Sequence, residues 1–292
     1  MRILLLGHLG QLGWEARRSL ACLGDIIALD YPQIDLSQPH TLPPLIREIK
    51  PHVIYNATAY TAVDKAEQEH HLAEQINAVA PGVLAECACE IRAVLIHFST
   101  DYVFDGTKGS PYTEDDIPNP LNVYGKTKWL GEQAIQAVDN AYLIFRTSWV
   151  YSLRRDSFVT KVLEWSRKQE VLRVVDDQIG NPTWARMLAE VTANLLASHR
   201  HDPYAQLYEK RGLYHLAGKG WASRFEWAQA ILASDPQREE QITRQLLPAR
   251  TEEFPTPAQR PLFSALDCNR FEQKFGLCLP PWREALILAM QR

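Results

Sequence analysis

Gly7-His8-Leu9-Gly10-Gln11-Leu12-Gly13 is the stretch that decides the fold, because it joins an apolar run over 3–6 to an amphipathic run over 12–23. The first run predicts a buried strand and the second a helix. Glycines let the backbone turn sharply and pass close to a phosphate, whose charge then faces the helix N-terminus. The spacing is G-x-x-G-x-x-G, not the commoner G-x-G-x-x-G. Directly after the first strand it indicates a dinucleotide site; a merely structural turn is the alternative.

Short apolar runs alternate with longer amphipathic ones through the first half of the chain. We predict strands over 3–6, 26–29, 53–56, 94–98 and 142–145, and helices over 12–23, 42–49, 72–89 and 123–138. This alternation is typical of a parallel sheet covered by helices. It predicts an α/β fold of the Rossmann type, with a doubly wound sheet and ligands at the carboxyl ends of its strands.

The alternation becomes less regular after about residue 150. Helices are predicted over 158–167, 184–197 and 223–232, with a strand over 171–175, a polar turn over 176–182 and an extended segment over 248–260. We therefore expect a dinucleotide-binding Rossmann domain at 1–150. Residues 151–292 should form mainly a smaller substrate-binding lobe, with some helices returning to the main sheet.

An acidic residue, Asp30, ends the second predicted strand, where its side chain can bind the ribose hydroxyls of adenosine. It favours NADH over NADPH, because a carboxylate repels a 2′-phosphate. No lysine or arginine follows closely to bind that phosphate, although Arg17 or Arg18 could approach from the first helix. Asp35 and Leu36 follow at the expected border of the adenine.

The third predicted strand ends in Asn56-Ala57-Thr58-Ala59-Tyr60-Thr61, whose small residues would let the backbone pass under a dinucleotide. With two residues introduced below, the predicted cofactor-binding set is Gly7, Gly10, Gln11, Leu12, Gly13, Asp30, Asp35, Leu36, Ala57, Ala59, Tyr60, Thr61, Tyr124 and Lys128.

Tyr124 and Lys128 lie four positions apart in a predicted helix, so their side chains share one face. A free tyrosine has a pKa near ~10, too high for efficient proton transfer at neutral pH, and a neighbouring cation lowers it. Tyr-x-x-x-Lys also arises by chance on surface helices. Here it accompanies the glycine turn and Ser99-Thr100-Asp101-Tyr102, which follows the fourth predicted strand. Together they predict a hydroxyl pair and a lysine around a carbonyl, beside a dinucleotide.

Length and composition exclude other classes of protein. A chain of 292 residues with 46% hydrophobic and 23% charged residues is ordinary for a soluble globular protein. Its net charge of −4 argues against nucleic-acid binding. We interpret the pairs Arg154-Arg155 and Lys210-Arg211 as solvated loop charges. The apolar N-terminal run is too short for a signal peptide or a spanning helix, so we expect a cytoplasmic protein.

No metal site is predicted. Five cysteines occur in the chain, at positions that lack metal-ligand spacing and fit reduced thiols: Cys22, Cys87, Cys89, Cys268 and Cys278. His70-His71, near Glu67 and Glu69, is interpreted as a solvated helix start, since no third ligand has suitable spacing.

These features together resemble the extended short-chain dehydrogenase/reductase family, and most closely its bacterial branch that reduces dTDP-linked 4-keto-6-deoxy sugars. The resemblance covers nearly the whole chain. It rests on the glycine turn with Gln11 and on the segments 56–67, 99–104, 122–128, 145–151, 177–183 and 255–261. Leu262-Phe263 departs from the family, which has a smaller and more polar pair there.

The resemblance implies catalytic roles. Thr100 would hydrogen-bond the substrate carbonyl, and Tyr124 would protonate its oxygen as hydride arrives from the nicotinamide of NADH or NADPH. Lys128 would hold the nicotinamide ribose and keep the tyrosine acidic. The implied product of this branch is dTDP-L-rhamnose, made by reduction at C4.

The resemblance also implies substrate contacts. Asp101 and Trp149 would contact the sugar nucleotide; the alternatives are a strand-end cap and a core aromatic. Arg260 would meet the diphosphate, or instead form a surface ion pair. A homodimer is expected, and Glu15 is the only hint of a cation ligand at its interface.

Two other functions stay open. One is reduction of another nucleotide-linked 4-keto sugar, differing in base or stereochemistry. The other is a non-catalytic regulatory subunit that binds a dinucleotide, against which the joint presence of Thr100, Tyr124 and Lys128 counts.

Overall fold

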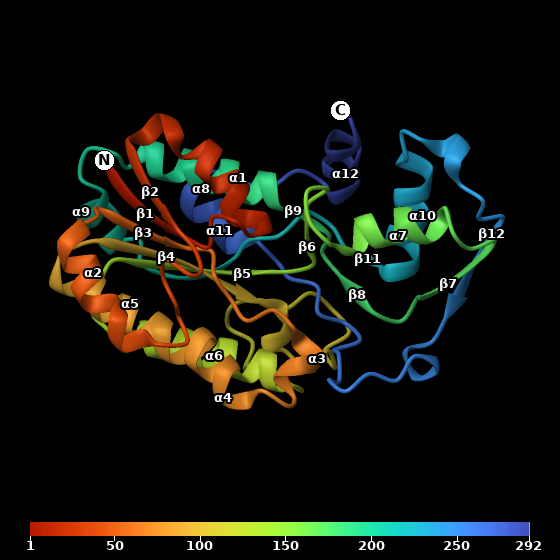
Figure 1. Ribbon diagram of the computed structural model, residues 1–292, viewed down its shortest axis with the longest axis horizontal. Coiled ribbons are helices and arrows are strands. Elements are labelled where there is room, and N and C mark those ends of the chain that lie inside the picture. Colours follow the sequence, from red (N-terminus) through yellow and green to blue (C-terminus); the bar gives the residue numbers. More distant parts are fainter. Residues whose placement is uncertain (292) are drawn as a thin grey trace.

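Six parallel strands form one sheet in this computed structural model, which describes residues 1–291 (Figure 1). The strands are β1 (Arg2–Leu6), β2 (Asp25–Leu29), β3 (Val53–Asn56), β4 (Val94–Thr100), β5 (Tyr142–Thr147) and β10 (Gly212–His215). They lie side by side in the order β10-β5-β4-β3-β1-β2. Because β1 pairs with both β2 and β3, the chain changes direction across the sheet there. Ligands of doubly wound sheets bind at such a switch point.

Helices cover both faces of this sheet. One face carries α1 (Gln11–Ser19), α8 (Ala185–Ser198), α9 (Pro203–Tyr208) and α11 (Asn269–Phe275); the other carries α2 (Leu42–Ile49), α5 (Ala80–Glu90) and α6 (Val123–Gln136). Along β1, Ile3 and Leu5 pack under the first set and Leu4 and Leu6 under the second. Burial on both faces explains why the strand is a continuous apolar run. The predicted Rossmann-type α/β fold is confirmed.

A smaller lobe stands beyond the carboxyl edge of the sheet (Figure 1). Its helices α7 (Phe158–Ser166), α10 (Arg224–Ser234) and α12 (Trp282–Met290) enclose the buried Trp227. Its strand pairs are β7 (Val171–Val175) with β12 (Gln245–Ala249), β6 (Val150–Tyr151) with β9 (Thr183–Trp184), and β8 (Ile179–Gly180) with β11 (Ala222–Ser223). Other short elements are α3 (Val63–Ala66), η1 (Ala21–Leu23), η2 (Pro39–Thr41), η5 (Arg238–Glu240) and η6 (Thr251–Glu253).

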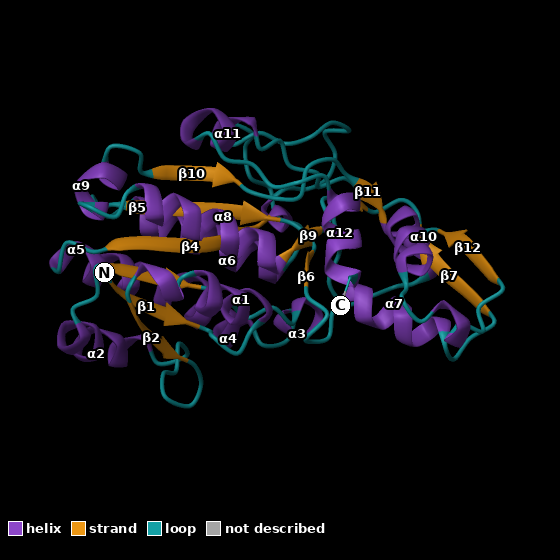
Figure 2. Cartoon of the chain, turned by 90° about the horizontal axis from the view of Figure 1, so that it is seen from above, coloured by secondary structure: helices purple, strands orange, loops and turns teal. Residues whose placement is uncertain are grey.

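The second half of the sequence also builds the main sheet. β10 pairs with β5 as an edge strand, and α8 packs on α1 across the apolar cluster that includes Leu188 and Leu196 (Figure 2). The chain therefore passes several times between the small lobe and the main sheet. Among residues 1–291, we find no helix long and apolar enough to cross a membrane.

The helix predicted over 72–89 contains a wider turn than expected. It consists of α4 (His70–Glu74), the π-helical η3 (Gln75–Val79) and α5. Within η3, the Asn77 Oδ1 atom accepts a hydrogen bond from the Tyr60 N–H at 2.9 Å. A Cβ atom on Gly131 of α6 would lie 2.1 Å from the Asn77 carbonyl oxygen, so α6 packs directly on this turn. The wide turn thus positions both the loop after β3 and the helix of Tyr124.

Other boundaries differ by small amounts. The helix predicted over 12–23 ends at Ser19 and is followed by η1, and α6 ends at Gln136. The segment predicted as extended over 248–260 includes the end of β12 and the short η6.

Asp101 ties the sheet to the C-terminal part of the chain. It begins η4 (Asp101–Val103) directly after β4, and only 2% of its surface is exposed. Its Oδ2 atom accepts hydrogen bonds from the Ser148 hydroxyl (3.0 Å) and the Ser264 hydroxyl (2.5 Å). Burial raises the pKa of Asp101 to about 6, and the hydrogen bonds from these two serines oppose that rise.

This raised pKa predicts how stability depends on pH. The folded chain holds the Asp101 proton more tightly than the unfolded chain, so this group's contribution is fully present below pH ~4 and is lost as pH rises through ~6. The unfolding free energy of the wild type minus that of Asp101→Asn should fall by on the order of 3 kcal/mol over this window. Urea unfolding at a series of pH values measures the difference.

Asp105→Asn is a control of opposite sign. Hydrogen bonds, first from Asn119 and then from Thr107, lower the pKa of Asp105 to about 2. Its contribution is therefore present above pH ~4 and lost as pH falls. A wild-type-minus-Asp101→Asn difference that is flat or rises with pH would contradict the assignment.

Candidate active site

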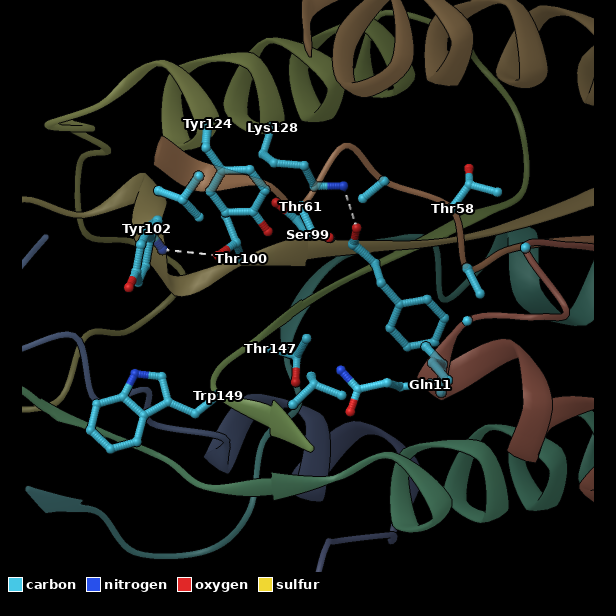
Figure 3. Close-up of a pocket in the computed structure, with 18 of the residues that line it drawn as sticks. Gln11, Thr58, Thr61, Ser99, Thr100, Tyr102, Tyr124, Lys128, Thr147 and Trp149 are labelled. Carbon is cyan, nitrogen blue, oxygen red and sulfur yellow. Dashed lines mark hydrogen bonds between the residues drawn. The ribbon is translucent and has the colours of Figure 1, made fainter. Parts of the chain in front are cut away.

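A cavity of about 960 Å³ lies at the carboxyl edge of the sheet (Figure 3). Parallel strands put their carboxyl ends along one edge, which is why loops far apart in sequence meet there. Its lining includes thirteen residues singled out from the sequence: Gly7, Gly10, Gln11, Leu12, Asp30, Ala57, Ala59, Thr61, Thr100, Asp101, Tyr124, Lys128 and Trp149.

The glycine turn forms one end of the cavity. Gly7 has φ 82°, and a Cβ atom there would lie 2.9 Å from the Thr58 Cγ2 atom. A Cβ atom on Gly13 would lie 2.0 Å from the Gly7 carbonyl oxygen, so α1 can start here only because both residues are glycine. The Leu9 N–H donates to the Asp30 Oδ2 atom at 2.8 Å, which fixes the carboxylate beside the turn.

Three buried polar atoms of the lining have no hydrogen-bond partner within residues 1–291. They are the Gln11 Oε1, Ser99 Oγ and Thr147 Oγ1 atoms. Leaving such atoms unpaired is costly, so the cavity suits a ligand with many polar groups. A narrow glycine cradle and these unpaired atoms together fit a dinucleotide.

Tyr124 reaches Thr100 because α6 begins very close to the end of β4. The Asn122 side chain caps the helix by accepting a hydrogen bond from the Gly125 N–H at 2.8 Å. A Cβ atom on Gly125 would lie 2.1 Å from the Tyr102 carbonyl oxygen. With glycine there, the Tyr124 hydroxyl lies beside that of Thr100, and both face the cavity (Figure 3).

The electrostatics of this pair differ from the sequence-based expectation. Burial raises the pKa of Tyr124, and the group that opposes the rise is the Thr100 hydroxyl rather than the lysine. Lys128 donates to the Phe98 carbonyl oxygen at 2.6 Å, and its Nζ atom lies 3.1 Å from the His97 Nε2 atom. Burial lowers the pKa of Lys128 to about 8. The ammonium is thus engaged with β4, not with the phenol.

Trp149 forms the other end of the cavity and adopts left-handed backbone geometry, with φ 45°. Its indole stacks on Trp227 with ring centroids 5.5 Å apart. A Cβ atom on Gly180 would lie 2.6 Å from the indole, so glycine there makes room for the ring. Figure 3 shows Trp149 and Gln11 on opposite sides of Thr147, well separated along the cavity.

Five predicted site residues lie outside the lining. Gly13 packs against Gly7, and Leu36 is buried in the apolar core. Asp35 accepts hydrogen bonds from the Ser37 N–H and hydroxyl, which lower its pKa. Tyr60 donates its hydroxyl hydrogen to Glu69.

Arg260 is the fifth, and it forms the ion pair that was its alternative. Its guanidinium meets both carboxylate oxygens of Asp64, at 2.7 and 3.1 Å. It lines a second cavity of about 560 Å³, next to Phe254 and Leu262.

Three arginines of the lining had no site role in the sequence analysis. Arg154 and Arg155 line the cavity, and the Arg155 Nη1 atom donates to the Leu9 carbonyl oxygen at 2.8 Å. Both are exposed loop residues, as predicted, and they also line the cavity. Arg224, the first residue of α10, lies 3.7 Å above the Trp149 ring. The capping pattern Ser223-x-x-Glu226 in the sequence indicates that a helix starts at Arg224. It does not indicate that the Arg224 side chain packs on Trp149.

Comparison with known proteins shows the family. The model of the RmlD substrate binding domain matches residues 1–292. The chain is 40% identical over 294 aligned positions to the dTDP-4-dehydrorhamnose reductase of Burkholderia thailandensis, covering 100% of this chain and 98% of that protein.

Solved structures agree over nearly the full length. A dTDP-4-dehydrorhamnose reductase from Clostridium acetobutylicum superposes with a TM-score of 0.90 at 34% identity, covering 99% of this chain and 98% of that one. The Bacillus anthracis enzyme of the same name, solved in complex with NADP, gives a TM-score of 0.86 at 34% identity, with 98% and 96% covered. The chain therefore belongs to the RmlD family, together with these dTDP-4-dehydrorhamnose reductases.

Proposed function

We propose that this chain reduces the C4 carbonyl of dTDP-4-dehydro-L-rhamnose to give dTDP-L-rhamnose, with NADH or NADPH as the hydride donor. The observation that carries the proposal is the meeting of Thr100, Tyr124 and Lys128 in one cavity with the glycine turn. Full-length similarity to dTDP-4-dehydrorhamnose reductases supports the choice of substrate.

The residues divide the chemistry between them. When bound, the nicotinamide supplies a hydride to the carbonyl carbon. Negative charge then develops on the carbonyl oxygen, where the Thr100 hydroxyl donates a hydrogen bond and the Tyr124 phenol donates a proton. Because burial raises the pKa of Tyr124, the phenol stays protonated at neutral pH, which is the form that reduction requires. Lys128 would hold the nicotinamide ribose.

The substrate side of the proposal rests on the far end of the cavity. Trp149 offers a flat apolar wall for the sugar nucleotide. The Asp101 Oδ2 atom accepts from two serines and its Oδ1 atom accepts from the Thr100 hydroxyl at 3.3 Å, which leaves acceptor capacity for sugar hydroxyls. The small lobe would thus supply the substrate-binding face.

A cytoplasmic location and a homodimer complete the proposal. The five cysteines are all unpaired thiols, as expected in a reducing compartment. The dimer rests on the resemblance described in the sequence analysis.

The first test supplies dTDP-4-dehydro-L-rhamnose, or its precursor with the matching epimerase, and follows NADH absorbance with identification of the product. We expect NADH consumption and dTDP-L-rhamnose. Folded protein that binds NADH yet consumes none with this sugar would overturn the function. A different C4 epimer, or preference for another base, would point instead to another nucleotide-linked 4-keto sugar.

The second prediction concerns the acid. Tyr124→Phe should lower kcat by roughly 10²–10⁴-fold, because it removes the proton donor and keeps the ring. NADH affinity, measured by fluorescence titration, should change little. Tyr208→Phe loses only the hydrogen bond of its hydroxyl to Asp139 and should keep normal turnover. More than half of the wild-type kcat in Tyr124→Phe would remove this residue from the mechanism.

The third prediction concerns cofactor choice. Asp30→Asn removes the charge that repels a 2′-phosphate while keeping an acceptor for the Leu9 N–H. The ratio of kcat/KM for NADPH to that for NADH should rise roughly fivefold, as expected for one exposed charge interaction of about 1 kcal/mol.

Asp25→Asn is the matched control, because it removes the same charge from the exposed amino end of β2, the strand that Asp30 follows. Its cofactor ratio should equal that of the wild type. An unchanged ratio in Asp30→Asn would show that Asp30 does not discriminate at the ribose.

A further inference from the structure

Arg224 places a guanidinium in the cavity at its Trp149 end. It is the first residue of α10, where Ser223 and Glu226 form a capping box that fixes the start of the helix. The guanidinium carbon lies 3.7 Å from the centre of the Trp149 ring and 4.9 Å from that of Phe158. Stacked on aromatic faces, a guanidinium keeps the N–H donors along its edge free for other partners.

The charge of Arg224 lacks a carboxylate partner. Within residues 1–291, no Asp or Glu oxygen comes within 4.0 Å of its nitrogen atoms. The carboxylate of Glu226 instead accepts from the Ser223 N–H at 2.9 Å. That of Asp101 accepts from Ser148 and Ser264. A guanidinium remains charged at any physiological pH, so Arg224 presents a cation to the cavity. The Asp101 carboxylate is near enough for its charge to interact with this cation, but its oxygens lie beyond ion-pair distance.

Arg260 shows the opposite arrangement. Both arginines lie beside Tyr102, where burial raises the pKa of the phenol and their positive charges oppose the rise. Arg260, however, is neutralised by a two-point ion pair with Asp64. Of these two neighbours, only Arg224 has its charge available in the main cavity.

The anion that matches this charge belongs to the substrate rather than to the dinucleotide. The phosphates of a dinucleotide face the glycine turn and the start of α1. Trp149, on which Arg224 stacks, lies far from Gln11 along the cavity (Figure 3). A sugar nucleotide packed on Trp149 carries a diphosphate, and a guanidinium binds two phosphate oxygens at once.

We propose that Arg224 is the residue that binds the diphosphate of the nucleotide-linked substrate, in place of Arg260. This assignment deepens the proposed function and rests on it for the identity of the substrate. It makes the small lobe the source of both the apolar wall and the cation that recognise the substrate.

The experiment measures binding of dTDP to NADH-loaded protein by calorimetry in the wild type and three variants. Arg224→Met and Arg224→Gln remove the charge and should weaken dTDP binding roughly 10- to 100-fold, the range for a charge-assisted hydrogen bond. Arg224→Lys keeps the charge and should lie between them and the wild type. Arg283→Met is the control, since Arg283 stacks on Trp282 at the surface of the same lobe and should bind dTDP normally.

The order of the variants separates charge from packing. If Arg224 only supported Trp149, Met or Gln would bind dTDP as well as Lys does, and the proposal would be overturned. Affinity within twofold of wild type in Arg224→Met, or a wild type that binds no dTDP, also overturns it. A wild type that binds dTDP through Arg224 yet reduces no 4-keto sugar would end the proposed function and leave this inference standing.

Discussion

The cavity exists because two helices approach the carboxyl edge of the sheet more closely than any side chain would allow. At α1 the contact is between Gly13 and the Gly7 carbonyl, and at α6 it is between Gly125 and the Tyr102 carbonyl. In both places an added Cβ atom would lie within about 2.1 Å of backbone oxygen, far inside contact distance. The first approach opens the glycine cradle, and the second brings the Tyr124 phenol to Thr100. Backbone packing therefore sets the positions of both the glycine cradle and the Tyr124 and Thr100 pair.

Burial then determines the protonation states inside the cavity. Burial, and secondarily the Lys128 charge, lower the pKa of His97 well below its usual value, so the imidazole beside that lysine stays neutral. The His97 Nδ1 atom lies 3.0 Å from the Asn56 amide nitrogen, which extends the polar chain to the end of β3. This chain holds the Lys128 ammonium in a fixed place against β4. Fixed donors of this kind need no reorganisation when charge develops on a substrate.

The sequence predicted those site residues that local strand pattern places, and missed those that long-range packing places. Residues at strand ends, such as Thr100 and Asp30, were predictable because the alternating pattern locates every carboxyl end on one edge. Arg224 was not, since it reaches the cavity only through packing of the small lobe, whose segments come from distant parts of the chain. For Arg260 the sequence left an ion pair open as the alternative but could not name its partner, because Asp64 lies far away in sequence and pattern alone does not reveal a long-range ion pair. The helix predicted over 12–23 ends earlier, at Ser19, because local geometry rather than apolar periodicity ends it.

Different interactions hold the two ends of the cavity: the main sheet holds one, and packing in the small lobe holds the other. This difference affects which part of the chain can change substrate specificity. The reacting end sits on the sheet, with Thr100 and Lys128 almost fully buried. The proposed substrate end depends on Trp149, a non-glycine residue with positive φ. This conformation costs about 1 kcal/mol or more unless its surroundings enforce it. Here Gly180, Trp227 and the Arg224 guanidinium enforce it together. A change at any of these neighbours would alter the indole's position without touching Tyr124. Substrate choice can thus shift in the small lobe while the proton and hydride chemistry stays intact.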